Sequence, residues 1–215
     1  AAAGVDALAP EQVVGLNPEG TPVRGTRLVL GPGTGLGVAA IVADEPPRIV
    51  ASEAGHITFA STDDIAARLN AEGRARWGRV SWERVLSGAG LAWLHEVVSG
   101  QAVRPEDIAD AARAADPQAL RTARLFSRLL GEFAGDACLA FQATEGVYLC
   151  GGVLRGLWPS FDAPAFLAAF AAKGRFSAQL RRVPVHFAAG HELGLQGAAH
   201  LLAGRCRMPS MEWSA

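Results

Sequence analysis

Three short apolar runs follow one another in the first quarter of the chain and predict consecutive β-strands. They cover residues 26–30, 38–42 and 48–51 and consist mainly of valine, leucine, isoleucine and alanine. Apolar segments of this length, bounded by glycine and proline, are typical of strands. Only a glycine cluster at residues 31–37 separates the first two runs, so we expect a hairpin with Thr34 at its tip.

The rest of the chain is mostly helical in pattern. Apolar side chains recur at every fourth position from residue 125 to residue 141, which predicts a long amphipathic helix beginning near residue 120. Shorter helices are expected after a capping-box-like start at residues 61–64 and over residues 81–98 as one helix capped by Ser81. Further helices are expected from Pro105 onward, through Phe166 to residue 172, and over residues 193–202. Residues 146–150 and 183–187 have the pattern of further strands. Strands and helices therefore interleave, and the predicted fold class is α/β.

Composition narrows the classes of function. The chain has 215 residues, 20 of them basic and 21 acidic, and its formal net charge is −1. This balance argues against a nucleic-acid binder that works by electrostatics, and no apolar run is long enough to span a bilayer. The three cysteines lie far apart in the sequence and predict neither a disulfide framework nor a metal knuckle, so we expect a reducing cytoplasm.

The glycine cluster suits close approach of the backbone to a phosphate. Glycine tolerates positive φ, and successive N–H groups in such a turn can point into one anion-binding concavity. The spacing does not fit a dinucleotide fingerprint, because Leu36 replaces the last glycine and a strand follows instead of a helix. It does not fit a Walker loop, because the cluster ends without a lysine. A phosphate-binding hairpin and a ligand-free glycine hairpin both stay open at this point.

Glu53, His56 and Glu83 form a second candidate group. Carboxylates and imidazole hydrogen-bond a polyhydroxylated ligand at defined angles, which makes these side chains candidates for sugar recognition. A simpler alternative is that Glu83 stabilises the first turn of its helix and that His56 is merely solvated. The sequence separation between the two segments leaves their proximity as an assumption.

Several segments taken together resemble the bacterial glucokinases of the hexokinase/actin-like superfamily. Residues 30–38 look like the second phosphate loop of that family, residues 52–60 like its E-G-G-H-x-x-F-A sugar motif, and residues 80–88 like its V-S-x-E-R-x-L-S-G helix. Residues 146–153 are similar to its adenosine motif, and residues 174–176 and 193–199 to its closing segments. The motifs occur in the family's order over nearly the whole chain, so their combination carries the resemblance.

The resemblance implies that residues 1–215 form the larger, C-terminal α/β lobe of an actin-like (ribonuclease H-like) ATPase fold. The parent activity would be ATP-dependent phosphorylation of D-glucose to glucose 6-phosphate, with Mg²⁺ bridging the phosphates. The implied glucose ligands are Glu53, His56 and Glu83, and the implied ATP contacts are Gly33, Thr34, Gly35, Gly151 and Gly152. No structural metal is expected, because the Cys-rich zinc motif of the related repressor/kinase group is absent from the sequence. Ala54 replaces a usual glycine and would be strained if its position required a positive φ.

Two parts of the family's machinery do not occur in these 215 residues. There is no D-x-G-G-T motif, which forms the other phosphate loop, and no Asn-Asp pair, whose aspartate takes the proton from the 6-hydroxyl of the sugar. Phosphoryl transfer depends on positioning both reactants, so we expect no catalytic residue in this chain and no turnover by the chain alone.

Two explanations of this gap stay open. In the first, the N-terminal lobe is missing, and the face that would contact it is apolar and exposed. In the second, the chain is a complete protein that keeps only a sugar- or nucleotide-binding role. A kinase for a related hexose or amino sugar is a further alternative, and a homodimer is an expected partner state.

Overall fold

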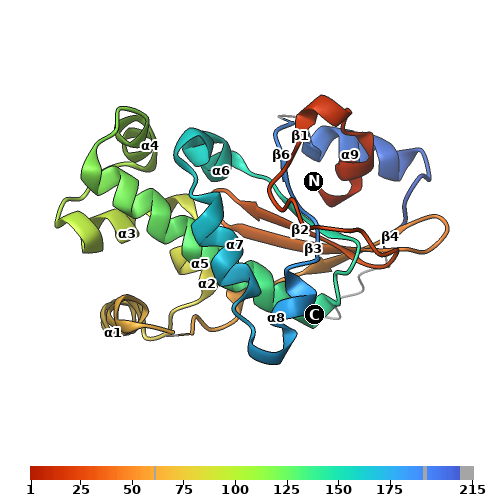
Figure 1. Cartoon of the computed structure of the whole chain (residues 1–215). Helices are drawn as coiled ribbons and strands as arrows, with labels where there is room; N and C mark the ends of the chain where they lie inside the picture. The colour runs from red at the N-terminus through yellow and green to blue at the C-terminus, as the bar shows by residue number, and fades with distance from the viewer. Residues whose placement is uncertain (61, 191–192, 209–215) are drawn as a thin grey trace.

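A single mixed sheet organises the molecule (Figure 1). The computed structural model describes residues 1–60, 62–190 and 193–208. The six strands lie in the order β1-β6-β5-β2-β3-β4. Their bounds are β1 Val13–Gly15, β2 Arg27–Pro32, β3 Leu36–Val42, β4 Arg48–Ser52, β5 Gly146–Leu149 and β6 Val185–Ala188.

The first three predicted strands are joined as expected, and the structure adds the direction of the other strands. Strands β2, β3 and β4 form an antiparallel meander, and β5 and β6 continue the sheet parallel to β2. The predicted α/β class with a three-strand glycine-loop meander is therefore confirmed. Strand β1, which pairs antiparallel with β6, was not predicted.

Helices cover both faces of the sheet. The larger core lies between the sheet and α1 Asp64–Trp77, α2 Trp82–Val85, α3 Gly88–Ser99, α4 Pro105–Arg113, α5 Pro117–Phe141, α6 Gly152–Leu157, α7 Ala163–Ala171 and α8 Ser177–Leu180. The smaller core lies on the other face, against the 3₁₀ helix η1 Ala2–Ala7 and α9 Leu193–Leu202. Successive residues of β2 alternate between the two cores: Leu28 and Leu30 pack into the larger one and Val29 into the smaller one. The strand is apolar on both faces because both faces are covered.

The expected single helix over residues 81–98 is wrong, because the structure has two helices there. Helix α2 ends at Val85, and α3 begins at Gly88 after its own N-cap, Ser87, whose Oγ accepts a hydrogen bond from the Gly90 N–H at 3.1 Å. A side-chain oxygen that satisfies a free N–H of the first turn fixes a helix start. The Ser87-Gly88 pair therefore marks a second helix start rather than a position inside one helix.

Two smaller differences concern helix starts. The N-cap of α1 is Asp63, which accepts from the Ala66 N–H at 2.8 Å, whereas Ser61 of the expected capping box lies outside the described residues. Helix α5 begins at Pro117, capped by Asp116, three residues before the expected start. Helix α6, which follows β5 directly, was not predicted. Among the described residues, no helix is both long and apolar enough to cross a membrane.

Candidate active site

The tip of the β2–β3 hairpin is a tight glycine turn held from outside by the α2–α3 segment. Within the turn, the Gly33 N–H donates to the Gly35 carbonyl at 2.8 Å. The Gly33 carbonyl accepts from the Gly88 N–H at 2.8 Å, and the Leu36 N–H donates to Glu83 Oε2 at 3.0 Å. The helix break at Ser87-Gly88 is what frees the Gly88 N–H to reach the hairpin.

Gly35 is packed against Glu83. A Cβ at Gly35 would lie 2.5 Å from Glu83 Oε2, which is far inside van der Waals contact. The glycine therefore lets the carboxylate come close enough to accept from the next backbone N–H. The contact with Glu83 is therefore sufficient to explain why residue 35 is a glycine, whether or not a phosphate binds there.

The two predicted sugar segments meet at the same place. His56 Nε2 lies 3.8 Å from Glu53 Oε2 and 3.8 Å from Glu83 Oε1. The 3₁₀ turn η3, Ala54–His56, follows β4 and carries the imidazole, while α2 carries Glu83. The side chains of Glu53 and His56 are 86% and 55% exposed and that of Glu83 is 32% exposed, so the cluster is open on one side to a ligand.

The turn that carries His56 is held without backbone strain. Ala54 is not among the described non-glycine residues with positive φ, which are Ala115 and Gln142. The alanine therefore brings no positive-φ strain to this turn. Arg79 donates to the His56 carbonyl and, at 3.4 Å, to the Thr58 hydroxyl, which ties the turn to the segment before α2.

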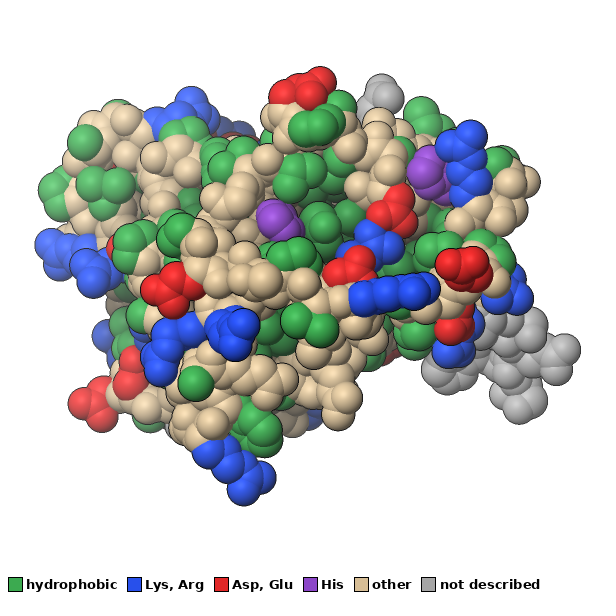
Figure 2. Space-filling model, turned by 45° about the vertical axis from the view of Figure 1, so that its right-hand side comes forward, with side chains coloured by type: hydrophobic (Ala, Val, Ile, Leu, Met, Phe, Trp, Pro, Cys, Tyr) green, Lys and Arg blue, Asp and Glu red, His purple; other side chains and the backbone are tan. Residues whose placement is uncertain are grey.

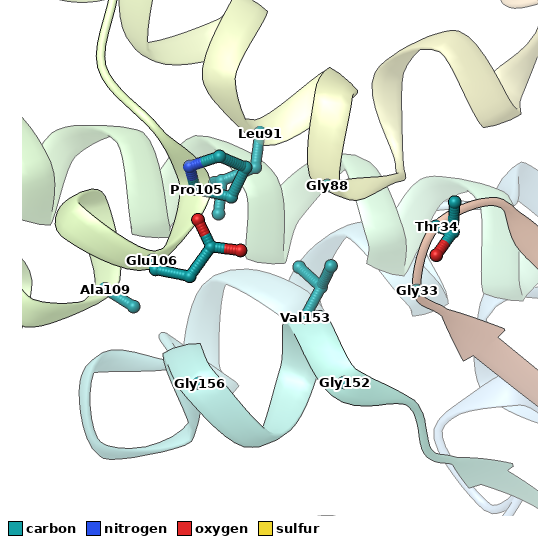
Figure 3. Close-up of a pocket in the computed structure, with 10 residues that line it drawn as sticks. All are labelled: Gly33, Thr34, Gly88, Leu91, Pro105, Glu106, Ala109, Gly152, Val153 and Gly156. Carbon is teal, nitrogen blue, oxygen red and sulfur yellow. The ribbon is translucent and has the colours of Figure 1, made fainter.

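A pocket of about 280 Å³ opens beside the hairpin tip (Figure 3). The hairpin, α3, α4 and α6 surround it, and the residues that line it are Gly33, Thr34, Gly88, Leu91, Pro105, Glu106, Ala109, Gly152, Val153 and Gly156. Three residues implied as nucleotide contacts, from two distant motifs, thus share one pocket: Gly33, Thr34 and Gly152. In Figure 3 Thr34 lies at one end of this pocket and Glu106 at the other.

Gly151 lies outside this pocket. Its φ is +100°, and a Cβ there would lie 2.3 Å from the Pro32 carbonyl oxygen. An L side chain fits neither this dihedral angle nor the space beside Pro32. Glycine at this position therefore lets the chain turn from β5 into α6 in close contact with the end of β2. Contact of Gly35 and Gly151 with a nucleotide stays a prediction.

Two residues of the site were not predicted. The Gly88 N–H could have been found from the Ser87 cap, which is a recognisable helix-start signal. Glu106 has no such signal, because only the packing of α4 beside α3 and α6 brings it to the pocket. Among the described residues no group of three or more His, Cys, Asp or Glu side chains could hold a metal ion.

Charged side chains of both signs are present on the face of the molecule shown in Figure 2. On the face shown in Figure 2, basic and acidic side chains are interspersed, without a continuous basic stripe. This distribution agrees with the balanced charge of the sequence.

Comparison with known proteins decides the family. A family model described as Glucokinase matches residues 1–205. The chain belongs to the glucokinase family. The glucokinase of Chromohalobacter salexigens is 41% identical to it over 209 residues, which cover 94% of this chain and 65% of that protein.

Solved glucokinases have the same fold. A glucokinase from an Antarctic psychrotroph superposes with a TM-score of 0.84 at 29% sequence identity. The superposition covers 94% of this chain and 66% of the psychrotroph protein. A ROK family glucokinase from Streptomyces griseus superposes with a TM-score of 0.55 at 22% identity, over 83% of this chain and 60% of its own, and shows the fold alone. The sheet is that of an actin-like ATPase fold, as the resemblance implied. The chain spans about two thirds of the length of the relatives it matches.

Proposed function

We propose that this chain is the lobe of a glucokinase that binds glucose and holds the phosphates of ATP, for transfer of the γ-phosphoryl group to the 6-hydroxyl of D-glucose. One observation carries the proposal: a single carboxylate, Glu83, faces the Glu53–His56 cluster with one oxygen and closes the glycine hairpin with the other. A sugar site and a phosphate site that share a side chain suit a reaction between their two ligands.

The comparisons support both ligands. The relatives that the chain matches are named glucokinases, and the Streptomyces griseus protein was solved with glucose and AMPPNP. In this proposal Glu53, His56 and Glu83 hydrogen-bond glucose hydroxyls, and a wrong epimer is disfavoured because it leaves these polar groups unpaired. In the same proposal the ATP phosphates contact Gly33 and Thr34, and the adenosine contacts Gly152. The family resemblance adds Gly35 and Gly151 to these contacts.

Mg²⁺ enters the proposal only as part of the MgATP substrate. Magnesium sites usually combine one or two protein carboxylates with phosphate oxygens. At the hairpin the described residues do not offer such a set, because Glu83 Oε2 accepts from the Leu36 N–H and the Glu106 carboxylate lies at the other end of the pocket. No step of the transfer is therefore assigned to an ion held by this chain.

The general base and the first phosphate loop are proposed to come from an N-terminal lobe. An exposed apolar surface supports this: on α9, Leu195 and Leu202 are 69% and 89% exposed, the highest values among the large hydrophobic side chains described. Leu195 and Leu202 are seven residues apart and so lie on one face of the helix, where they form an apolar strip of the kind that a contacting lobe would cover. The proposed location is the cytoplasm, and Cys138, Cys150 and Cys206 are all buried and unpaired.

A coupled assay of glucose phosphorylation tests the proposed function. The 215-residue chain alone should give no turnover, and mixing it with an N-terminal lobe from the same family should restore activity. Loss of a general base by itself typically costs about 10²–10⁴-fold. Glucose or ATP binding without rescue would instead favour a non-catalytic module, and rescue only with another hexose or an amino sugar would replace glucose as the substrate. Turnover by the chain alone would contradict the assignment of the base to a second lobe.

Replacing Thr34 with valine separates the two ligands. The change removes a hydroxyl at the hairpin tip while keeping the shape of the side chain, so ATP should bind about tenfold more weakly. Glucose affinity should not change, because Thr34 lies in the pocket and not in the Glu53–His56–Glu83 cluster. Titration calorimetry with each ligand measures both, with Thr21→Val as the matched control. Equal ATP affinity in the two variants would exclude a phosphate contact by Thr34.

A further inference from the structure

Glu106 occupies the end of the pocket that lies across from the phosphate hairpin. It is the second residue of α4, and it is the one charged residue among the described residues that line this pocket. Figure 3 shows its carboxylate directed into the space between α4 and α6, with the Thr34 hydroxyl on the opposite side. Leu91, Ala109 and Val153 make the walls between them apolar.

The fold leaves this carboxylate exposed, with a through-space charge interaction with Arg104. Within the described part of the chain Glu106 makes no hydrogen bond, whereas the adjacent Asp107 accepts from Arg104 Nε at 2.8 Å and from Arg104 Nη2 at 2.9 Å. Both acids can stabilise the positive end of α4, so that role does not need the side chain of Glu106 inside the pocket. The pair thus offers one carboxylate that is hydrogen-bonded to Arg104 and one without a described hydrogen bond, on the same turn.

The chemistry of a carboxylate limits what it can recognise. An ionised carboxylate only accepts hydrogen bonds, and it repels phosphate groups. With phosphates at Gly33 and Thr34, the opposite end of the pocket is left for the nucleoside. The donors of an adenine nucleoside are the ribose hydroxyls and the exocyclic amine of the base, and the apolar walls suit the flat faces of the base.

We propose that Glu106 accepts a hydrogen bond from the nucleoside part of the bound nucleotide and thereby selects for nucleosides that carry this donor. The proposal rests on the proposed function, since it assumes that the pocket takes ATP. It adds a specificity residue that neither the glycine motifs nor the family resemblance identified.

The test measures binding of ATP, 2′,3′-dideoxy-ATP and inosine triphosphate to the 215-residue chain and to the variants Glu106→Ala and Glu106→Gln. Glu106→Ala should bind ATP roughly ten- to one-hundred-fold more weakly, the range for a lost hydrogen bond to a charged group. Glu106→Gln keeps one acceptor oxygen and should recover part of this loss. If the donor is a ribose hydroxyl, the preference for ATP over the dideoxy nucleotide should disappear in Glu106→Ala. If the donor is the amine, the preference over inosine triphosphate should disappear.

Asp107→Asn is the matched control, because it removes the same charge from the same turn. Charge loss alone should leave ATP affinity unchanged or slightly higher, since a triphosphate is repelled less. Glu106→Ala with the ATP affinity of the wild type, or with both nucleotide preferences intact, would overturn the role of Glu106 and leave the nucleotide site standing. No ATP binding by the wild-type chain would overturn the nucleotide site itself, and the role of Glu106 with it.

Discussion

Replacing Glu83 with alanine is expected to weaken the binding of glucose and of ATP separately, each in the absence of the other ligand. Glu83 Oε1 lies 3.8 Å from His56 Nε2, and Oε2 accepts from the Leu36 N–H at 3.0 Å. Loss of a hydrogen bond to a charged group costs about 1.5–3 kcal/mol, or roughly ten- to one-hundred-fold in affinity. Titration calorimetry on the 215-residue chain with each ligand alone measures both effects.

Glu53→Ala is the control for the sugar half of this expectation. Glu53 lies in the same cluster but has no described contact with the hairpin, so its loss should weaken glucose binding and spare ATP binding. Gly35→Ala tests the other half, because its Cβ would push Glu83 Oε2 away from the Leu36 N–H. It should lower ATP affinity in the same direction as Glu83→Ala. An ATP affinity equal to that of the wild type in Glu83→Ala would show that the carboxylate does not hold the hairpin.

Replacing Gly151 with alanine is expected to give the largest loss of stability among single-methyl additions near the site. The residue has φ +100°, and its Cβ would lie 2.3 Å from the carbonyl oxygen of Pro32. Backbone strain of about 1–3 kcal/mol adds to about 1–3 kcal/mol for overpacking. For a domain of this size each kcal/mol shifts Tm by about 2–4 °C, so thermal unfolding should move down by roughly 5–20 °C.

Gly78→Ala separates the two causes of that loss. Gly78 also has a positive φ, +75°, but nothing lies within 4 Å of its Cβ position. Its substitution should cost about 1–3 kcal/mol, from the dihedral alone. Circular-dichroism melting of both variants gives the comparison. Equal losses of stability in the two variants would mean that the close approach of the Gly151 Cβ position to the Pro32 carbonyl adds nothing to the cost of Gly151→Ala.

Much of the sheet could be predicted because its signals are local. The three apolar runs and the glycine cluster lie within residues 26–51, and they became β2, β3 and β4 with the turn at Thr34. Apolar alternation and turn chemistry act over a few residues, so they are visible in one sequence. Strand β1 was missed because its three residues are only half-buried or exposed at the sheet edge and carry no such pattern.

The break between α2 and α3 shows where local signals fail. Residues 81–98 read as one helix, since the apolar pattern continues across Ser87 and Gly88. The backbone leaves the helix there because Ser87 caps a new one and the Gly88 N–H bonds to the Gly33 carbonyl at 2.8 Å. That partner lies 55 residues earlier in the chain, so the helical pattern alone cannot reveal it.

The sequence by itself determined the residue types of the site and the elements that carry them: a glycine hairpin, a Glu-x-x-His turn and a glutamate at a helix start. Only the tertiary structure decided that Glu53, His56 and Glu83 meet, that Glu83 also closes the hairpin, and that Glu106 enters the pocket. The difference comes from the separation along the chain over which each kind of interaction acts. Turn and helix signals depend on neighbouring residues, whereas these contacts depend on where the sheet and the α2–α4 segment place side chains that are distant in the chain.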